Sequence, residues 1–446
     1  MNTLKRFWGN LRTSFWFVPF LIVAFSIALA VALIAVDSTV GDRWLNRWPR
    51  LLGADAVGAR AMLSTIAGSM MTVVGVTFSM TLVTLALASS QYSSRILRNF
   101  IRDRVTQVVL GIFGGIFTYC LIVLRTIRVG EEFGFVASLA VSFSIVLAIA
   151  GIGVLIYFIH HIASSIQASS IIAVVADETM DAVDRLFPSA LGQAAGDDEA
   201  DQVSRTAPQR VWQSVPGIGN GYIQSVDGRA LMRLACQHKT IVRMEHGIGT
   251  FLVHGTPLIS VALDSPPDDE LVASLQAAYT ISRHRTLDQD CAFGIRQIVD
   301  MAMRALSPSV NDTTTAIMCV DYLTAILSRL SLRDIPSPYR FVDEELRMIA
   351  VGQTFASLVS ESFDQIRGSA GGNTALLLRL LGAVQTITSL TARPLRRQVL
   401  REQVAWIAEL AGRTIEAPHD LGRFSNRLAQ VIESFETVPA APATQR

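Results

Sequence analysis

A stripe of hydroxyl and glycine residues runs through one apolar segment of this sequence. Residues 61–90 carry no charge, and their small polar side chains recur every three or four positions. On a helical wheel, five of these residues fall in one narrow sector. Hydrocarbon offers no water to a hydroxyl, so a stripe of this kind suits contact with protein or with water. The five residues are Thr65, Gly68, Thr72, Gly75 and Ser79.

Two kinds of chemistry fit this stripe. Small residues at this spacing let membrane helices approach closely, and a threonine hydroxyl can bond to a carbonyl of its own helix. Alternatively, symmetric copies would place the hydroxyls around an aqueous path, where they replace part of an ion's hydration. Thr77, Thr81 and Thr84 gather on the opposite side of the same helix. The sequence leaves helix packing and pore lining both open.

A group of arginines follows this segment. Arg95, Arg98 and Arg102 share one side of a helix, and apolar residues take the other side. This pattern is typical of a helix at the lipid surface, with its arginines near anionic headgroups. At the mouth of a pore, a ring of the same arginines would favour anions.

The elements that must position these residues are membrane spans. The chain has 446 residues, of which 50% are hydrophobic and 17% are charged, and its mean hydropathy is +0.40. Each of four uncharged runs is long enough to cross about 30 Å of hydrocarbon. Because these runs hold no acidic or basic residue, a pump that needs an intramembrane carboxylate is not expected. The predicted spans are residues 14–36, 61–90, 105–124 and 133–159.

Lysine and arginine in the flanking segments predict the orientation. The segments on one side, residues 1–13 and 91–104, carry three and four of them, against four and two in residues 37–60 and 125–132. The arginines are also denser in residues 91–104. We therefore expect a multi-pass protein of the bacterial inner (plasma) membrane with both termini in the cytoplasm.

The rest of the chain reads as a cytosolic α+β region. Together with the four helical spans, it gives a fold class that is mainly α. Residues 161–187 read as a stalk helix with a narrow apolar seam, which packs either on a neighbour or on its own soluble domain. A linker at 188–209 precedes a small β module at 210–265, where short β-rich runs alternate with glycine. Residues 266–436 read as a helical domain, and the tail at 437–446 as disordered.

Polar residues cluster in sequence within the helical domain. They would form one polar site if they met in space, but no pairing of a nucleophile with a base singles out a reaction. Asp312 has a simpler interpretation as the N-cap of a helix that begins at Thr313. The candidate residues are Asp290, Arg296, Asp300, Asn311 and Asp312.

Composition and motifs exclude several classes of function. The net charge of +1 and the lack of basic tracts argue against a nucleic-acid partner. The four cysteines are far apart and form no metal-ligand spacing, so neither a disulfide framework nor a metal site is expected. No phosphate-binding loop or catalytic motif is present. We expect no cofactor and no enzymatic activity.

Five stretches of the sequence form a specific combination: GSMMTVVGVTFSMTLVTLALASSQYSSRILRNF, VLGIFGGIFTYCLIVLRTIR, LIYFIHHIASSIQ, GYIQSVD and FGIRQIVDMAMRALSPSVNDTTTA. Together they resemble the bacterial predicted membrane proteins of the domain of unknown function 2254 family. The resemblance covers roughly residues 15–411. It implies an integral bacterial membrane protein with a soluble C-terminal half, and it implies no particular activity.

Two functions fit these features. The first is a homo-oligomeric, channel-like or transport-related protein, in contact with membrane lipids, whose transported ion or small ligand the sequence does not identify. The second is a membrane-anchored sensor or scaffold, in which the cytosolic domain binds a ligand or partner and the spans only pack. Exposure of the Thr65–Ser79 sector to water distinguishes the two functions.

Overall fold

The computed structural model describes residues 16–40, 56–91, 103–127, 137–165, 167–187 and 210–436. The chain divides into two compact units, Met1–Ser170 and Ile171–Arg446. The predicted linker at 188–209 and the predicted disordered tail at 437–446 lie outside the described residues.

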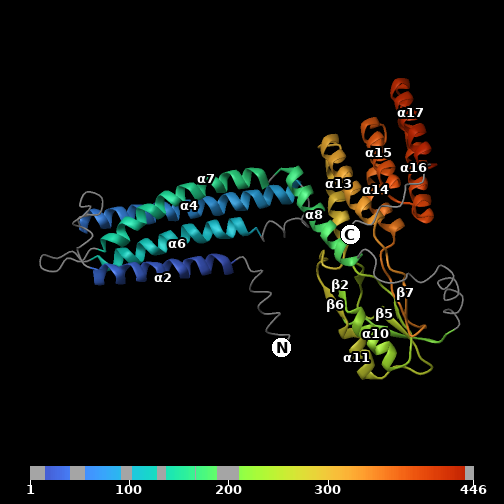
Figure 1. Cartoon of the computed structure of the whole chain (residues 1–446), viewed down its shortest axis with the longest axis horizontal. Helices are drawn as coiled ribbons and strands as arrows, with labels where there is room; N and C mark the ends of the chain where they lie inside the picture. Colours follow the sequence, from blue (N-terminus) through green and yellow to red (C-terminus); the bar gives the residue numbers. More distant parts are fainter. Residues whose placement is uncertain are drawn as a thin grey trace. The chain divides into compact units, whose positions relative to one another are not determined.

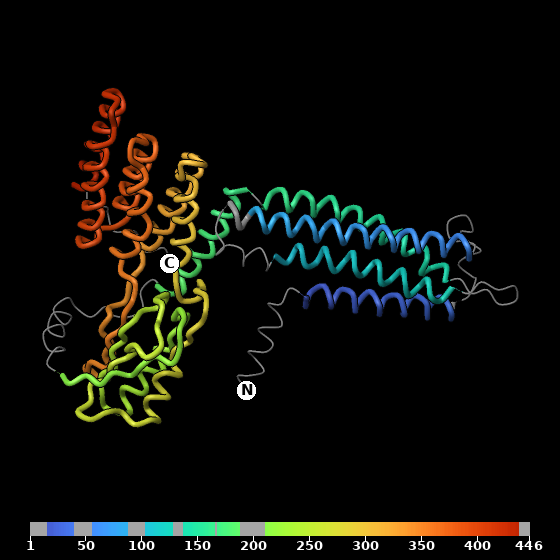
Figure 2. The backbone as a smooth tube through the Cα atoms, turned by 180° about the vertical axis from the view of Figure 1, so that it is seen from behind, coloured from blue at the N-terminus to red at the C-terminus, as the bar shows by residue number. Residues whose placement is uncertain are grey.

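The described part of the first unit contains four long helices, which confirm the four predicted spans. Figures 1 and 2 show them side by side, and α6 contacts each of the other three. All four are long and apolar enough to cross a membrane. They are α2 (Phe17–Val40), α4 (Ala56–Gln91), α6 (Arg104–Thr126) and α7 (Ser138–Ser165).

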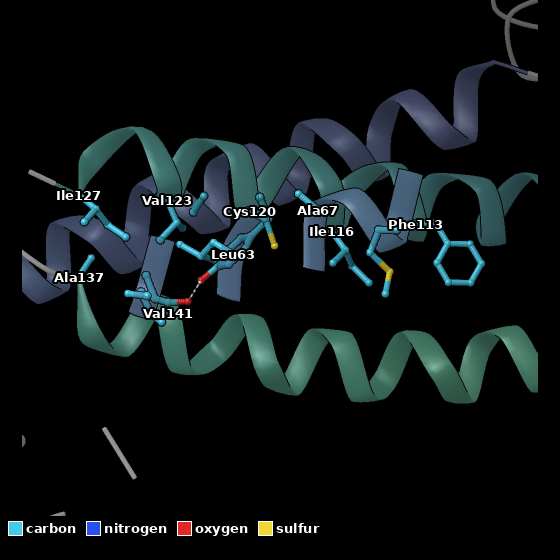
Figure 3. Close-up of a cluster of buried hydrophobic side chains, with 14 of the residues drawn as sticks. Leu63, Ala67, Phe113, Ile116, Cys120, Val123, Ile127, Ala137 and Val141 are labelled. Carbon is cyan, nitrogen blue, oxygen red and sulfur yellow. Dashed lines mark hydrogen bonds between the residues drawn. The ribbon is translucent and has the colours of Figure 1, made fainter. Parts of the chain in front are cut away.

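The core of this unit forms around α6. Phe113, Ile116 and Cys120 of α6 lie in one buried cluster with Leu63 of α4 and Val141 of α7 (Figure 3). The hydroxyl of Tyr119, itself fully buried, donates to the carbonyl of Ala140 at 2.8 Å. The apolar side chains and this hydrogen bond hold α4, α6 and α7 together.

The end of α2 differs from the prediction. The helix continues past residue 36 and includes Asp37, so the first span contains a carboxylate that the predicted boundary excludes. The Asp37 carboxylate accepts hydrogen bonds from the backbone N–H groups of Leu139 and Ala140 at 3.2 and 3.1 Å. It thereby satisfies unpaired donors in the first turn of α7, which explains a charge at this position.

The predicted stalk corresponds to α8 (Ala168–Leu186), which packs within the second unit. Its buried face includes Ile172, Val175 and Val183. The predicted apolar seam is only partly correct, because Val183 is buried but Ser169 is exposed and Ala173 and Met180 are half-buried. Its Asp184 pairs with Arg329 and Arg333. Of the two interpretations of this helix, the structure supports packing on its own soluble domain.

Two small sheets lie in the second unit. The five-stranded sheet has the order β1-β5-β3-β8-β7, in which β3 and β8 are parallel and the other pairs antiparallel. The three-stranded sheet has the antiparallel order β4-β2-β6. Short helices α10 (Gly228–Gln237) and α11 (Asp269–Ala277) accompany them. The strands are β1 (Trp212–Pro216), β2 (Gly221–Val226), β3 (Val242–Met244), β4 (Phe251–Leu252), β5 (Pro257–Ala262), β6 (Tyr279–Ser282), β7 (Tyr339–Val342) and β8 (Glu345–Ile349).

Three of these strands lie outside the predicted β module at 210–265. β6 follows α11, and β7 and β8 interrupt the region that the sequence predicts as helical. The β7–β8 hairpin turns through Asp343 and Glu344, both with positive φ, at 50° and 64°. Turns of this kind usually contain Asn-Gly or Asp-Gly, so the Asp-Glu pair does not predict a hairpin from the sequence.

The remaining helices stand side by side in the C-terminal part of the second unit (Figure 1). Most begin with a side-chain cap, and α16 and α17 instead begin with proline at their first position. They are α12 (Cys291–Ala305), α13 (Thr313–Ser331), α14 (Phe355–Gly368), α15 (Thr374–Leu390), α16 (Pro394–Thr414) and α17 (Pro418–Ser434).

Candidate functional site

The hydroxyl and glycine stripe lies on the face of α4 that points away from its own chain. All five of its residues, Thr65 to Ser79, are exposed. The opposite face of α4 is buried and includes Leu63, Ala67, Met70 and Thr77. The helix therefore packs inside the unit through one face and presents the stripe to the membrane environment or to another molecule.

The glycines of the stripe make no close packing contact within the chain. A Cβ atom added at Gly68 or Gly75 would meet no atom within 4 Å. On α6 the situation is the reverse, because a Cβ at Gly111 would lie 2.7 Å from Ile22 Cδ1 and a Cβ at Gly115 would clash with the Ser26 side chain. The Gly111-x-x-x-Gly115 pair thus brings α6 and α2 into close contact.

This packing role of α6 was not predicted from the sequence. The signal was present as two glycines four residues apart in an apolar helix. The close helix contact inside the chain belongs to Gly111 and Gly115, whereas Gly68 and Gly75 remain available for an outside partner.

The outward faces of the neighbouring helices have a different composition. On α7 the exposed side chains include Ile149 at 65% and Ile156 at 65% exposure, and on α2 they include Phe20 and Phe25 at 72% and 68%. Bulky apolar side chains of this kind suit contact with lipid tails. The exposed surface of α4 also carries bulky apolar side chains, but its central stripe is small and hydroxylated. These side chains include Met71, Val76, Phe78, Leu82 and Val83.

The threonine hydroxyls of the stripe bond to their own helix. Thr65 Oγ1 donates to the carbonyl of Ala61 at 2.8 Å, and Thr72 Oγ1 donates to the carbonyl of Gly68 at 3.0 Å. Each hydroxyl has only one proton, so its oxygen is left with acceptor lone pairs alone.

The second group of threonines lies on the inward side of α4. Thr77 and Thr84 are buried, and Thr81 is half-buried. Thr81 and Thr84 donate to carbonyls of their own helix, at Thr77 and Met80. The Thr77 hydroxyl is buried without a hydrogen-bond partner among the described residues.

The predicted headgroup arginines, Arg95, Arg98 and Arg102, lie outside the described residues. Directly after them, Asp103 caps α6 by accepting from the backbone N–H groups of Val105 and Thr106. Its carboxylate also meets His161 of α7.

One buried carboxylate organises the start of α12. Asp290 is 2% exposed, accepts from the backbone N–H of Phe293 at 3.1 Å, and binds Arg285 through two hydrogen bonds of 2.8 and 3.0 Å. Gly249, with φ of +84°, passes directly over this pair, and a Cβ there would lie 2.8 Å from Arg285 Nη2. The Asp290 carboxylate therefore caps α12 and binds Arg285 through both of its oxygens. This arrangement has a structural role, because it fixes the loop to the start of the helix.

The other predicted polar residues are distributed along α12 and beyond it. Arg296 pairs with Glu361 of α14, and Asp300 lies part-buried on the same helix as Arg296. Asn311 adopts a positive φ of 48° just before Asp312, which caps α13 by accepting from Thr315 N–H at 3.0 Å. Hydrogen bonds from Thr315 hold the pKa of Asp312 below its usual range.

The structure does not bring all five polar residues together. Asp290 precedes α12 and Asp312 follows it, and a helix of 15 residues is about 22 Å long. Among the described residues, no group of three or more His, Cys, Asp and Glu is placed to hold a metal ion. Burial raises the pKa of the Cys291 and Cys319 thiols to about 12, so neither is poised as a nucleophile.

Comparison with known proteins places the chain among membrane proteins of one family. Uncharacterized proteins of Mycobacterium bovis and of Mycobacterium tuberculosis strain H37Rv are each 32% identical to it over 458 residues, covering 100% of this chain and 85% of theirs. No solved structure matches the chain. The family model described as "Predicted membrane protein (DUF2254)" matches residues 12–386. The chain therefore belongs to the DUF2254 family of predicted membrane proteins.

Proposed function

We propose that this protein is a homo-oligomer of the bacterial inner membrane in which the α4 stripes of several copies line a channel-like path. The observation that carries the proposal is the exposed stripe from Thr65 to Ser79, placed opposite the packing face of α4. Its unfilled glycines give room for close approach, and its hydroxyls suit a partly hydrated path. The proposed role is transport-related and not enzymatic.

The hydrogen bonds of the stripe favour a cation as the transported species. The hydroxyl groups of Thr65 and Thr72 donate to carbonyls of α4, so their oxygens can accept a hydrogen bond or coordinate a cation but have no proton left to donate. Oxygen lone pairs can replace water around a cation but cannot donate to an anion.

The same hydrogen bonds also support a second candidate, the membrane-anchored sensor or scaffold. A hydroxyl that bonds to its own helix needs no water, and it can therefore lie in a dry contact between helices. In this case the stripes of two copies would pack together and the soluble unit would carry the function.

Cysteine reactivity tests the channel proposal. Single cysteines at Thr65, Thr72 and Ser79 should react with a charged methanethiosulfonate reagent added from water, because a thiol must ionise to react and does not ionise in a dry contact. Cysteines at Thr77 and Thr84 are the matched controls, and these should stay protected. A stripe as inert as the controls would contradict a water-filled path.

Enlarging the glycines separates the two candidates. Gly75→Leu in a pore lining should preserve the oligomer and reduce ion flux, whereas in a packing face it should dissociate the oligomer. Gly111→Leu provides the control, because it should disrupt the contact of α6 with α2 inside each copy. Oligomer size in mild detergent and ion flux into proteoliposomes are the two measurements. Loss of the oligomer in Gly75→Leu would favour the sensor or scaffold.

A further inference from the structure

One end of the three-stranded sheet presents an apolar tip. β2 runs antiparallel to both β4 and β6, with Gly221 opposite Leu252 and Tyr222 opposite Ser282. The start of β2 therefore lies at the same end of the sheet as the ends of β4 and β6. The chain segments that meet there are residues 217–220, residues 253–256 and the residues after Ser282.

The two loops of this tip are tied to each other by backbone hydrogen bonds. Gly217 N–H donates to the Thr256 carbonyl at 2.9 Å, and Gly255 N–H donates to the Gly217 carbonyl at 3.1 Å. His254 N–H donates to Asn220 Oδ1 at 2.7 Å. These hydrogen bonds hold the two loops in a fixed arrangement.

Large apolar side chains point outward from this rigid tip. Ile218 is 60% exposed, and Phe251 and Val253 are each 51% exposed. Phe251 packs edge-on against Tyr222, with ring centroids 5.1 Å apart. Exposed apolar side chains grouped at one end of a small module mark an interaction surface.

The charge around the tip is basic. Arg283 and His284 directly follow β6, both are exposed, and Arg283 forms no ion pair within the described part of the chain. Neither tip loop contains an acidic residue.

A short connection joins the soluble unit to the fourth span. The fourth span ends at Ser165, and the second unit begins at Ile171. The few intervening residues tether the soluble unit close to the lipid headgroups, so a weak lipid contact gains a high effective concentration.

We propose that the tip formed by residues 217–220, 253–256 and Arg283 docks on the anionic lipid surface of the membrane that the same chain spans. Ile218 and Val253 would enter the headgroup region, and Arg283 would contact lipid phosphates. This proposal does not depend on whether α4 lines a path.

The test uses the full chain reconstituted into vesicles of phosphatidylcholine with or without phosphatidylglycerol. In a Cys236→Ser background, Ile218→Cys or Val253→Cys carries an environment-sensitive fluorophore. Ile432→Cys on α17 is the matched control, because Ile432 is 53% exposed. The control label should show water-like emission throughout.

Docking predicts a blue-shifted emission at both tip positions, which lipid-borne nitroxide quenches when phosphatidylglycerol is present. Arg283→Gln should weaken docking about fivefold. Water-like emission at both tip positions, equal to that of Ile432→Cys, would overturn the proposal. A blue shift that lipid nitroxide does not quench would also overturn it, because the tip would then be covered by protein.

Discussion

Nε2 of His161 in α7 lies 3.0 Å from Oδ2 of Asp103, the residue that caps α6. The same carboxylate accepts from the Thr106 hydroxyl at 2.7 Å. Asp37 plays a related part elsewhere in the unit, where it caps α7 from the end of α2. Two carboxylates therefore each join a pair of spans at a helix start.

Asp103→Ala should destabilise the first unit by about 0.5–2 kcal/mol, the usual effect of losing an N-cap. Asp103→Asn should retain most of that stability, because an asparagine oxygen also accepts the backbone N–H bonds. Thermal unfolding of the detergent-solubilised protein measures both variants. If asparagine were as damaging as alanine, the interaction with His161 would outweigh the cap.

The ion pairs of Asp184 should make the packing of α8 against α13 depend on pH. Hydrogen bonds from Arg329, with Arg333 adding its charge, hold the pKa of Asp184 below its ordinary value of 3.8. Since the pKa of Asp184 is lower in the folded protein than in the unfolded chain, its interaction with the arginines fully stabilises the fold at pH values above 3.8. This stabilisation is lost as the pH falls through the folded pKa.

The matched variant is Asp184→Asn. At neutral pH it should lower the free energy of unfolding by about 1 kcal/mol, because the pair is partly exposed and screened. The difference from the unmodified protein should vanish at a pH well below 3.8. A difference that stays constant with pH would show that the Asp184 charge contributes nothing.

Asp290 and Asp312 are both N-caps, and they should respond differently to substitution. Asp312→Ala should cost about 0.5–2 kcal/mol, and Asp312→Ser should recover it. Asp290→Ala should cost about 3 kcal/mol or more, because it also leaves Arg285 without its buried partner. Chemical denaturation measures all three variants. If Asp312→Ser folds normally and still abolishes function, Asp312 has a chemical role beyond capping.

Orientation is tested by a reporter fusion. Alkaline phosphatase joined after residue 209 should be inactive in cells, because the arginine distribution and the four spans predict a cytoplasmic location. A fusion after residue 50, in the segment between the first two spans, should be active. High activity at the first site would reverse the topology.

The spans and the Asp312 cap were predictable because their signals are local. Four uncharged runs of sufficient length specify four helices, and Asp312 before Thr313 specifies a helix start. The outward or inward direction of the α4 stripe was not predictable, because it depends on which face packs against α6. The extension of α2 through Asp37 depends likewise on a partner about one hundred residues away.

The soluble unit shows the same limit. Arg396 and Arg397 lie in the first turn of α16, where charged side chains usually face solvent, yet both are 6% exposed. Arg396 donates to carbonyls at the end of α13, and Arg397 donates to the Phe435 carbonyl at the end of α17. Burial, with the charge of Arg393, lowers the pKa of Arg396 to about 10. Only the tertiary packing of helix ends explains these two arginines.

Disulfide cross-linking at Thr72 tests most directly whether α4 meets its counterpart in another copy. In a Cys236→Ser background, Thr72→Cys should form a cross-linked dimer when membranes are oxidised, because the exposed stripe would face the same residue in a neighbour. Ile149→Cys, on the bulky outward face of α7, should remain monomeric. A monomeric Thr72→Cys protein under conditions that cross-link Ile149→Cys would contradict the account, since α7 and not α4 would then form the contact between copies.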